Sequence, residues 1–136
     1  MGKHPAQKAF TVAFGTADKV AACDYLGLVS GNKTSDKVKK SGFTLTKSEF
    51  VDAPVINELK LVVECKAVNT VTVGSHMQIT GEVVNIQADE SILDERGKYS
   101  LEKLKPIIYD EENWRYLAVG EKAADAFKCG LVFKKA

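Results

Sequence analysis

One short stretch of the chain brings together glycines, a serine and a lysine that could form a binding loop. Residues 24–31 run from an acidic residue through an apolar stretch to Ser30 and Gly31, and Lys37 follows soon after. Glycine allows backbone conformations closed to other residues, and the lysine supplies a fixed positive charge. The alternative is ordinary helix punctuation by Gly27 and Gly31, with Lys37 as a solvated surface residue, which is the commoner use of such residues.

Metal and nucleophilic chemistry find little support in the sequence. His76 with Glu64 or Glu82 could be taken as a metal-binding pair, but a single histidine without matching ligand spacing falls short of a zinc site. Ser30 lacks both the G-x-S-x-G frame of a nucleophilic serine and a plausible base.

The three cysteines predict neither a disulfide framework nor a zinc site, because they lie far apart and form no C-x-x-C pair. Cys65 falls on the apolar side of a predicted strand, where cysteine behaves as a small hydrophobic residue. Cys129, beside Lys128, is the cysteine we expect to be exposed. We expect all three to be reduced structural thiols.

Length and charge indicate a single domain that remains in the cytoplasm. The 136 residues carry 19 Lys and Arg against 18 Asp and Glu, so no strong field favours a nucleic acid or an anionic membrane as partner. No apolar run approaches the roughly 20 residues of a membrane-spanning helix, and the first residues lack a signal-peptide core.

Short helices are expected on either side of the glycine segment. Residues 9–14 predict a strand, after which Thr16 can cap a helix with Asp18 in its first turn. A second short helix is predicted from Thr34 or Ser35 through residue 40, and Gly42 would end it.

The strongest structural signal is a long strand followed by a hairpin. From residue 59 to 73 the odd positions are nearly all apolar, while Glu64 and other polar residues alternate with them, which predicts a half-buried strand. Gly74 and Ser75 suit a two-residue turn, so His76 begins the return strand. On that strand the apolar parity switches after Gly81, which predicts a bulge near this residue.

The remaining sequence predicts a β-rich α+β domain, with an antiparallel barrel as its natural closure. The other expected elements are a strand at 43–45, an extended segment at 52–54, a turn at 94–97, a helix at 100–104 ended by Pro106, and strands at 107–109 and 114–119. Residues 110–112 are expected to form a solvated acidic loop.

Several segments of the chain occur in the same order and at similar spacing in the flavoredoxins, which belong to the flavin reductase-like family of FMN-binding split barrels. These segments are Asp24-Tyr25-x-Gly27-x-x-Ser30-Gly31 with Asp36-Lys37, Asp52-Ala53-Pro54, Glu64-Cys65-Lys66, Gly74-Ser75-His76, Gly81-Glu82-Val83 and Ala88-Asp89-Glu90. The resemblance runs from about residue 10 to 127. It implies an antiparallel split β-barrel with short peripheral helices.

The resemblance also implies that residues 1–136 form one flavin reductase-like domain, equivalent to the C-terminal portion of the family's full domain. Members of the family usually carry an earlier segment with the first barrel strands and much of the flavin phosphate site. Here the expected strand at residue 9 follows Met1 almost directly. The phosphate would then need other ligands, such as Lys3, Lys8 or the helix beginning at Thr16.

The resemblance implies an FMN site with three residues around the flavin ring. In flavoredoxin-like proteins these are the lysine after the Ser-Gly segment, the histidine after the hairpin turn and a late aromatic residue, which correspond to Lys37, His76 and Tyr109. A cation or donor at the N1/O2 edge stabilises reduced flavin, and an aromatic residue suits the flat ring. Ser30 and Gly31 would shape the loop.

Two functions from different classes are therefore expected. The first is an FMN-dependent oxidoreductase, a homodimer with flavin at the subunit interface, which takes electrons or hydride from a nicotinamide nucleotide or a protein donor. The alternative is a shortened, non-catalytic split-barrel module for dimerisation or ligand binding without flavin. Trp114 has no assigned role in either, although it could cover a ring or seal a dimer interface.

Overall fold

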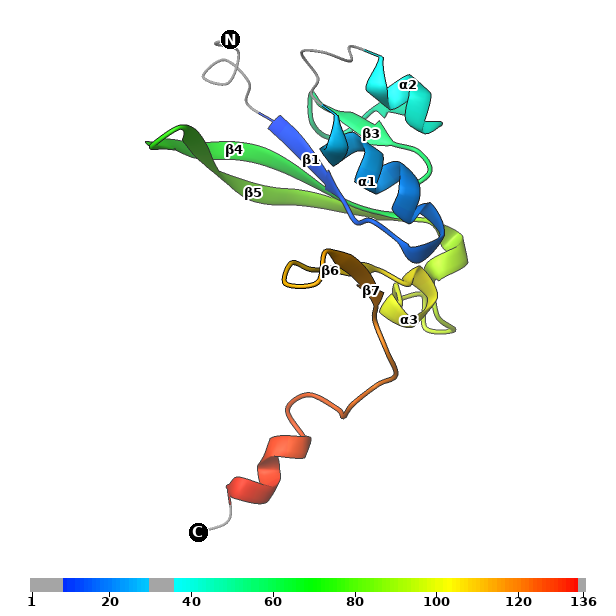
Figure 1. The fold of residues 1–136 in the computed structure, drawn as a ribbon. Coiled ribbons are helices and arrows are strands. Elements are labelled where there is room, and N and C mark those ends of the chain that lie inside the picture. The colour runs from blue at the N-terminus through cyan, green and yellow to red at the C-terminus, as the bar shows by residue number, and fades with distance from the viewer. Residues whose placement is uncertain (1–8, 30–35, 135–136) are drawn as a thin grey trace.

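The computed structural model describes residues 9–29 and 36–134 (Figure 1). Its elements, with η marking a 3₁₀ helix, are β1 (Ala9–Ala13), η1 (Ala17–Lys19), α1 (Val20–Leu28), α2 (Lys37–Ser41), β2 (Leu45–Lys47), β3 (Pro54–Ile56), β4 (Leu61–Val73), β5 (His76–Ala88), η2 (Glu90–Ile92), α3 (Leu101–Leu104), β6 (Ile107–Asp110), β7 (Arg115–Ala118) and η3 (Cys129–Phe133). Within these ranges the strands pair antiparallel, in sheets of order β1-β4-β5, β2-β3 and β6-β7.

The central sheet is built on the long β4–β5 hairpin. The predicted turn at Gly74 and Ser75 is confirmed: Gly74 has φ 59°, and Val73 pairs with His76. Strand β1 pairs with β4 only from Val62 to Lys66. The rest of the hairpin therefore projects as a two-stranded ribbon, which extends to one side of the molecule in Figure 1.

The predicted bulge near Gly81 is confirmed. Register shifts leave Val68 and Val84 without a direct partner on either side of the Gly81–Ala67 pair. Gly81 also lies under the Phe10 ring, because a Cβ added to it would come within 2.4 Å of Phe10 Cζ. The absence of a side chain at Gly81 thus allows β1 to pack against β5 where the hairpin bends.

The segment around the small β2–β3 sheet lies over the face of β4 that carries Glu64. The prediction from alternating apolar and polar residues was wrong for this face. Glu64 was expected on a solvated face, but it is fully buried. Its carboxylate accepts hydrogen bonds from the Ser48 hydroxyl and from the Asn85 side-chain amide. Ser48 in turn accepts from the backbone N–H groups of Phe50 and Val51, at 3.0 and 3.1 Å. A polar network therefore ties the loop after β2 to the sheet.

The first helix begins differently from the prediction. Thr16 precedes η1, but its hydroxyl donates to Asp18 Oδ1 at 2.6 Å and does not cap the backbone. The α-helical hydrogen bonds start only at α1. The end of the second helix is as predicted, since Gly42 terminates α2 in the left-handed region at φ 87°.

The strands after α2 differ from the prediction in place and number. Strand β2 lies two residues later than expected, and its partner β3 begins at Pro54, the last residue of the segment expected only to be extended. The helix at α3 is capped as predicted, because Ser100 Oγ accepts from Lys103 N at 3.4 Å. Leu61, Ile92 and Leu104 form a small core cluster that packs η2 and α3 against the sheet.

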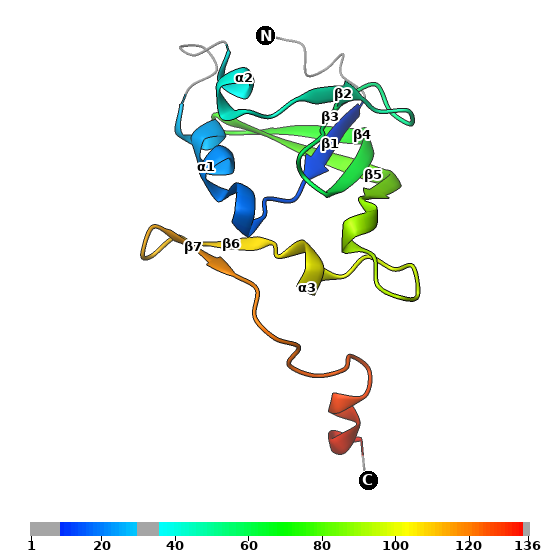
Figure 2. The same cartoon turned by 90° about the vertical axis from the view of Figure 1, so that its right-hand side faces the viewer.

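The chain leaves the sheets after β7 and continues as an arm. Figures 1 and 2 show this segment running away from the sheets in both views, with η3 near its end. Within the described ranges, no helix is long and apolar enough to cross a membrane.

Candidate functional site

Lys37 is held in place by the end of α1. Its ammonium group donates to the carbonyl oxygens of Leu26 at 3.0 Å and Val29 at 3.4 Å. Free carbonyl groups at a helix C-terminus carry partial negative charge, so a lysine placed there is stabilised. An ammonium group has three N–H donors, and the bonds to described residues use two of them. Lys37 is thus a positioned cation rather than a freely solvated one.

The segment around Gly27 is helical, whereas the binding-loop interpretation predicts a backbone turn there. Gly27 lies inside α1 and has no positive φ, and a Cβ added to it would meet nothing within 4 Å. The interpretation of Gly27 as a residue that turns the backbone is therefore wrong, and the helix extends to Leu28. Ser30 and Gly31 lie outside the described residues.

Tyr109 belongs to an aromatic pair on the β6–β7 hairpin. Its ring centroid lies 5.5 Å from that of Tyr116, with an angle of 43° between the planes. Tyr116 donates its hydroxyl hydrogen to Asp24 Oδ1 at 2.7 Å, and this bond raises the pKa of Tyr116. Because Asp24 lies on α1, the hairpin is fastened to the helix whose end holds Lys37. The structure thus brings Lys37 and the tyrosine pair to one helix.

Sequence reasoning missed the part played by Tyr116. The motif containing Asp24 was recognised, but nothing in the sequence linked Asp24 to a residue 92 positions away. The only available signal was the presence of Tyr109 and Tyr116 on two strands expected to be neighbours, where facing aromatic residues commonly pair.

His76 lies apart from these residues. It begins β5 at the free end of the ribbon and is exposed, with Nδ1 2.9 Å from the Ser75 hydroxyl. Among the described side chains, no hydrogen bond or aromatic contact joins His76 to Lys37 or Tyr109. One copy of the chain therefore does not assemble the three residues into a single contact cluster, and their shared role stays a prediction.

Trp114 is placed at the turn between β6 and β7, with 84% of its surface exposed and φ 52°. Among the described residues, it pairs with no other aromatic ring. In the acidic run beside it, Glu111 and Glu112 are exposed as expected. The prediction is wrong for Asp110, which ends β6, is half-buried and pairs with Arg115 at 2.9 Å. Hydrogen bonds from Asn113 and Arg115 hold the pKa of Asp110 below its ordinary value.

The cysteines have the environments expected of them. Cys65 is buried and Cys129 is exposed, and none of the three forms a disulfide. Burial raises the pKa of the Cys65 and Cys23 thiols, which makes them poor nucleophiles. The described part of the chain holds no group of three or more His, Cys, Asp or Glu side chains suited to a metal ion.

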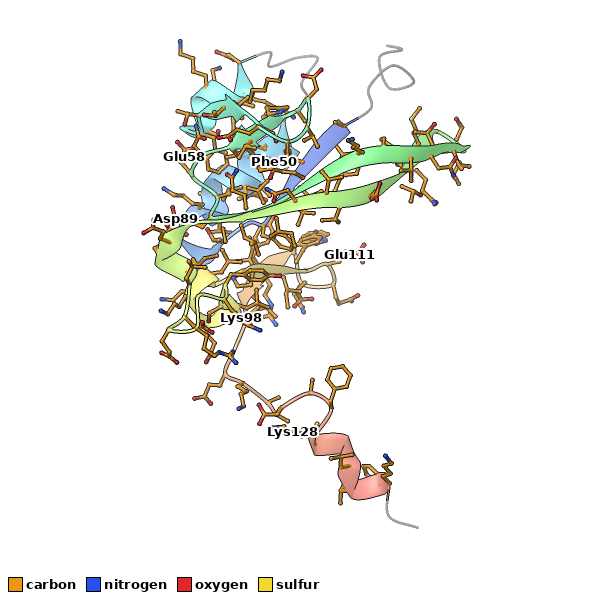
Figure 3. The ribbon with its side chains drawn as sticks, turned by 180° about the vertical axis from the view of Figure 1, so that it is seen from behind. Phe50, Glu58, Asp89, Lys98, Glu111 and Lys128 are labelled. Atoms are coloured by element: carbon orange, nitrogen blue, oxygen red, sulfur yellow. The ribbon has the colours of Figure 1, made fainter. Side chains whose placement is uncertain are left out.

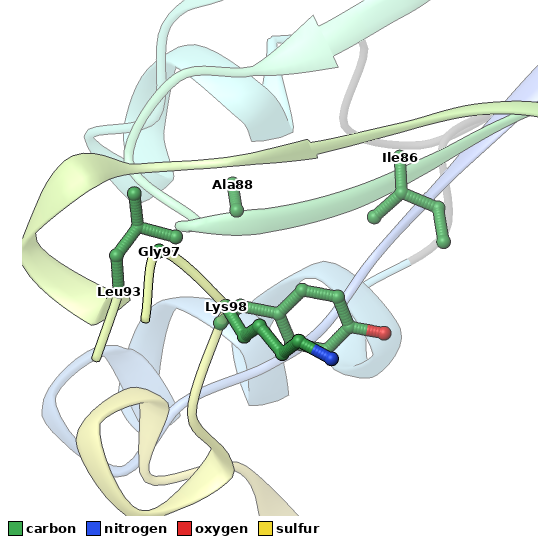
Figure 4. A pocket seen from close by; sticks show the side chains of 6 residues that line it. Ile86, Ala88, Leu93, Gly97 and Lys98 are labelled. Atoms are coloured by element: carbon green, nitrogen blue, oxygen red, sulfur yellow. The ribbon is translucent and has the colours of Figure 1, made fainter. Parts of the chain in front are cut away.

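An apolar cavity that sequence reasoning did not anticipate lies between β5 and the loop after η2. It has a volume of about 480 Å³. Its lining consists of Ile86, Ala88, Leu93, Gly97, Lys98 and Tyr99, and Figure 4 shows the Lys98 side chain on the loop side of it. Such a space suits an apolar or aromatic group.

Residues 4–118 match the model of the flavin reductase like domain. The chain belongs to the flavin reductase-like family. Flavoredoxin of Desulfovibrio vulgaris (Miyazaki F) superposes with a TM-score of 0.84 at 33% identity, over 93% of this chain and 67% of that one. Flavoredoxin from Methanosarcina acetivorans gives 0.79 at 33% identity, over 90% and 64%.

These matches establish the fold as an antiparallel split barrel, as predicted. An FMN-binding protein from Thermus thermophilus shares the fold at 21% identity, with a TM-score of 0.65 over 87% of this chain and 62% of that one. An uncharacterised Aquifex aeolicus protein is 37% identical over 83 residues, which is 59% of this chain and 42% of that protein. The chain thus spans about two thirds or less of the length of these relatives.

Proposed function

We propose that this chain binds FMN and transfers electrons or hydride through it, as an FMN-dependent oxidoreductase. Membership in the flavin reductase-like family supports a flavin-binding redox protein in general terms. The observation that carries the proposal is the Lys37 ammonium, which bonds to the Leu26 and Val29 carbonyl oxygens hold in place at the end of α1. We further propose that residues 1–136 act as one domain in the cytoplasm.

Each proposed site residue meets a different need of the cofactor. Bound FMN would supply the electron or hydride carrier. Lys37 and His76 would place positive charge or N–H donors near the edge of the ring where negative charge develops, and Tyr109 would pack beside the ring. Ser30 and Gly31 would shape the loop that approaches the cofactor. The roles of all five residues rest on the family resemblance.

The phosphate group is not expected to bind at Thr16. The Thr16 hydroxyl already donates to Asp18, and the positive charges of Lys19 and Lys60 act on the Asp18 carboxylate. A phosphate placed there would face a carboxylate, which repels it. Lys3 and Lys8 remain candidate ligands and lie outside the described residues.

A homodimer offers a way to complete the ring site. His76 lies at the tip of the exposed ribbon, away from the helix that holds Lys37 and the tyrosine pair. If the ribbon of one copy reaches over the other, His76 of the second copy would join Lys37 and Tyr109 of the first. The electron donor would be a nicotinamide nucleotide or a protein.

The test of cofactor binding is the visible absorbance spectrum of the purified protein, before and after FMN is added and the sample is desalted. We expect flavin absorbance to be retained in proportion to protein. A well-folded sample that retains no flavin would contradict the proposal. That result would favour the alternative, a dimerisation or binding module without flavin. The exposed apolar side chains of β4 and β5 are also compatible with such a module.

Replacing Lys37 by methionine tests its role at the ring. We expect Lys37→Met to lower the midpoint potential of bound flavin, because the reduced, negatively charged ring loses its neighbouring cation. A charged hydrogen bond of about 1.5–3 kcal/mol corresponds to about 30–65 mV for a two-electron couple. Lys39→Met, on the exposed side of the same helix, serves as the control and should leave the potential unchanged. An unchanged potential in Lys37→Met with flavin still bound would remove Lys37 from the site.

A further inference from the structure

Residues 120–134, which we term the C-terminal arm, receive no cover from the rest of the described chain. The backbone bond from Val119 N to Pro106 O, at 3.4 Å, ties the base of the arm to the hairpin. The backbone hydrogen bonds further along stay inside the arm, as from Leu131 N to Lys128 O at 3.0 Å. Every residue from 120 to 134 is exposed, and Figure 3 shows Lys128 well apart from Lys98 on the body.

The arm exposes several large apolar side chains to solvent. Phe127 is 97% exposed and Phe133 is 89% exposed, and Leu131 and Val132 are each more than half exposed. Removal of such side chains from water is favourable in proportion to the apolar area buried. The arm would therefore gain binding free energy by packing these side chains on an apolar surface.

The backbone at Phe127 points to the same conclusion. Phe127 has φ 65°, a backbone conformation that residues other than glycine seldom adopt. Such a conformation is strained and usually persists where surrounding atoms hold it. Among the described residues, none covers the Phe127 ring, so a partner packed on this ring would supply that support.

A matching apolar surface lies on the central sheet. By the strand register Val12, Val63 and Ile86 share one side of the sheet, and Val83 continues this side along the hairpin beyond the buried Cys65. Val12, Val83 and Ile86 are 45%, 53% and 46% exposed. We term this side the open face. The cavity of about 480 Å³ next to Ile86 and Tyr99 lies at one end of it.

Charge distinguishes the arm from the edge of the open face. The arm holds three lysines against two carboxylates, and Lys122 is already paired with Asp125 at 2.9 Å. The segment beside the cavity, residues 89–98, holds four carboxylates against two cations, and Arg96 is paired with Asp94 at 3.5 Å. When these two ion pairs are set aside, the arm keeps a net positive charge, chiefly from Lys128 and Lys134. The segment beside the cavity keeps a net negative charge.

We propose that the C-terminal arm of one copy packs on the open face of a second copy, with Phe127 near the cavity, and that the second arm does the same in return. A two-fold exchange satisfies both surfaces at once, whereas a foreign partner for the arm would leave the open face bare. The inference rests on the homodimer of the proposed function and adds the segment that holds it together.

Cys129 gives a direct test because it is an exposed thiol inside the arm, while Cys65 is buried. The chain would be labelled at Cys129 with a maleimide photo-crosslinker and mixed with an equal amount of unlabelled ¹⁵N chain. Irradiation should give cross-links between light and heavy peptides, mapping to residues 83–99. Cross-links confined to one isotope would show that the arm folds back on its own copy, and cross-links to another region of the second copy would misplace the acceptor; either result overturns the proposal.

Sedimentation equilibrium supplies the energetic test. The variant Phe127→Ser with Phe133→Ser should raise the dimer dissociation constant at least tenfold. Phe50→Ser is the matched control, because Phe50 is also exposed, at 58%, but lies near β2 and far from the arm (Figure 3). Unchanged dimerisation in the arm variant, or a monomeric parent chain, would overturn the proposal. Flavin retention is measured separately, so a failed dimer and a failed cofactor site are distinguishable.

Discussion

The two halves of strand β4 share one alternating sequence pattern but meet different surroundings. In the first half, Leu61, Val62, Glu64 and Cys65 are all at most 4% exposed. Strand β1 pairs along the edge of this half, the loop after β2 lies against Glu64, and the η2 and α3 residues of the core cluster pack on Leu61. In the second half, Val71 and Val73 are 44% and 57% exposed, although they continue the same apolar series. Alternation therefore predicts the strand itself, while the cover depends on which other elements reach it.

Removing the buried carboxylate gives the sharpest test of the covered half. Glu64→Leu should lower the free energy of unfolding by about 2–4 kcal/mol, because the Ser48 hydroxyl and the Asn85 amide lose a buried charged acceptor. Urea unfolding followed by circular dichroism measures the change. Glu82→Leu, at an exposed position on β5, is the control and should stay within about 0.5 kcal/mol of the parent chain. Equal effects of the two substitutions would break the distinction between covered and exposed positions.

Gly81 on β5 pairs with Ala67, which lies between the two halves of β4, and it allows a second test. Gly81→Val should cost about 1–3 kcal/mol, because any Cβ meets the Phe10 ring and approaches Cys65 Cβ to 3.1 Å. The control is Gly27→Ala, where the helix has room, and it should stabilise the protein by about 0.4–1 kcal/mol. Thermal melting of both variants tests the pair. A destabilised Gly27→Ala chain would mean that the end of α1 differs from this structure.

The smallest predicted effect is a pH-dependent change in stability at Thr16 and Asp18, which lie just after β1. The hydrogen bond from Thr16 holds the pKa of Asp18 below its ordinary value of 3.8, so the folded state resists protonation. Its stabilisation is present above about pH 4 and is lost as the pH falls through the folded pKa. Thr16→Val should therefore cost about 1 kcal/mol at pH 7 and less at pH 2.5.

Urea unfolding at the two pH values checks this expectation. Thr46→Val, at an exposed position on β2, is the control and should show no such pH dependence. A cost for Thr16→Val that is the same at both pH values would show that the hydroxyl contributes packing rather than a bond to a carboxylate.

Features set by neighbouring residues were the ones that the sequence could predict. The hairpin follows from alternation and the Gly74 turn, the bulge follows from the change of parity at Gly81, and the end of α2 follows from Gly42. Strand β3 and the burial of Glu64 could not be predicted in this way, because they depend on a second sheet folding over β4.

The candidate site shows the same division. Lys37 could be singled out from its local motif, but its bonds to Leu26 and Val29 depend on the path between α1 and α2. The link between Asp24 and Tyr116 joins distant parts of the sequence and left no local pattern. The meeting of His76 with the other two residues depends on a second copy in the proposed dimer, which no single-chain pattern specifies.

The bond between Asp24 and Tyr116 also has a consequence for the order of folding. The β4–β5 hairpin closes over a two-residue turn, which takes microseconds, whereas this bond must close a loop of 92 residues. Contacts of such long range form only after most of the intervening chain is ordered. The tyrosine pair should therefore reach α1 late, after the hairpin has formed and after the short-range bonds of Lys37 to the end of α1 can close.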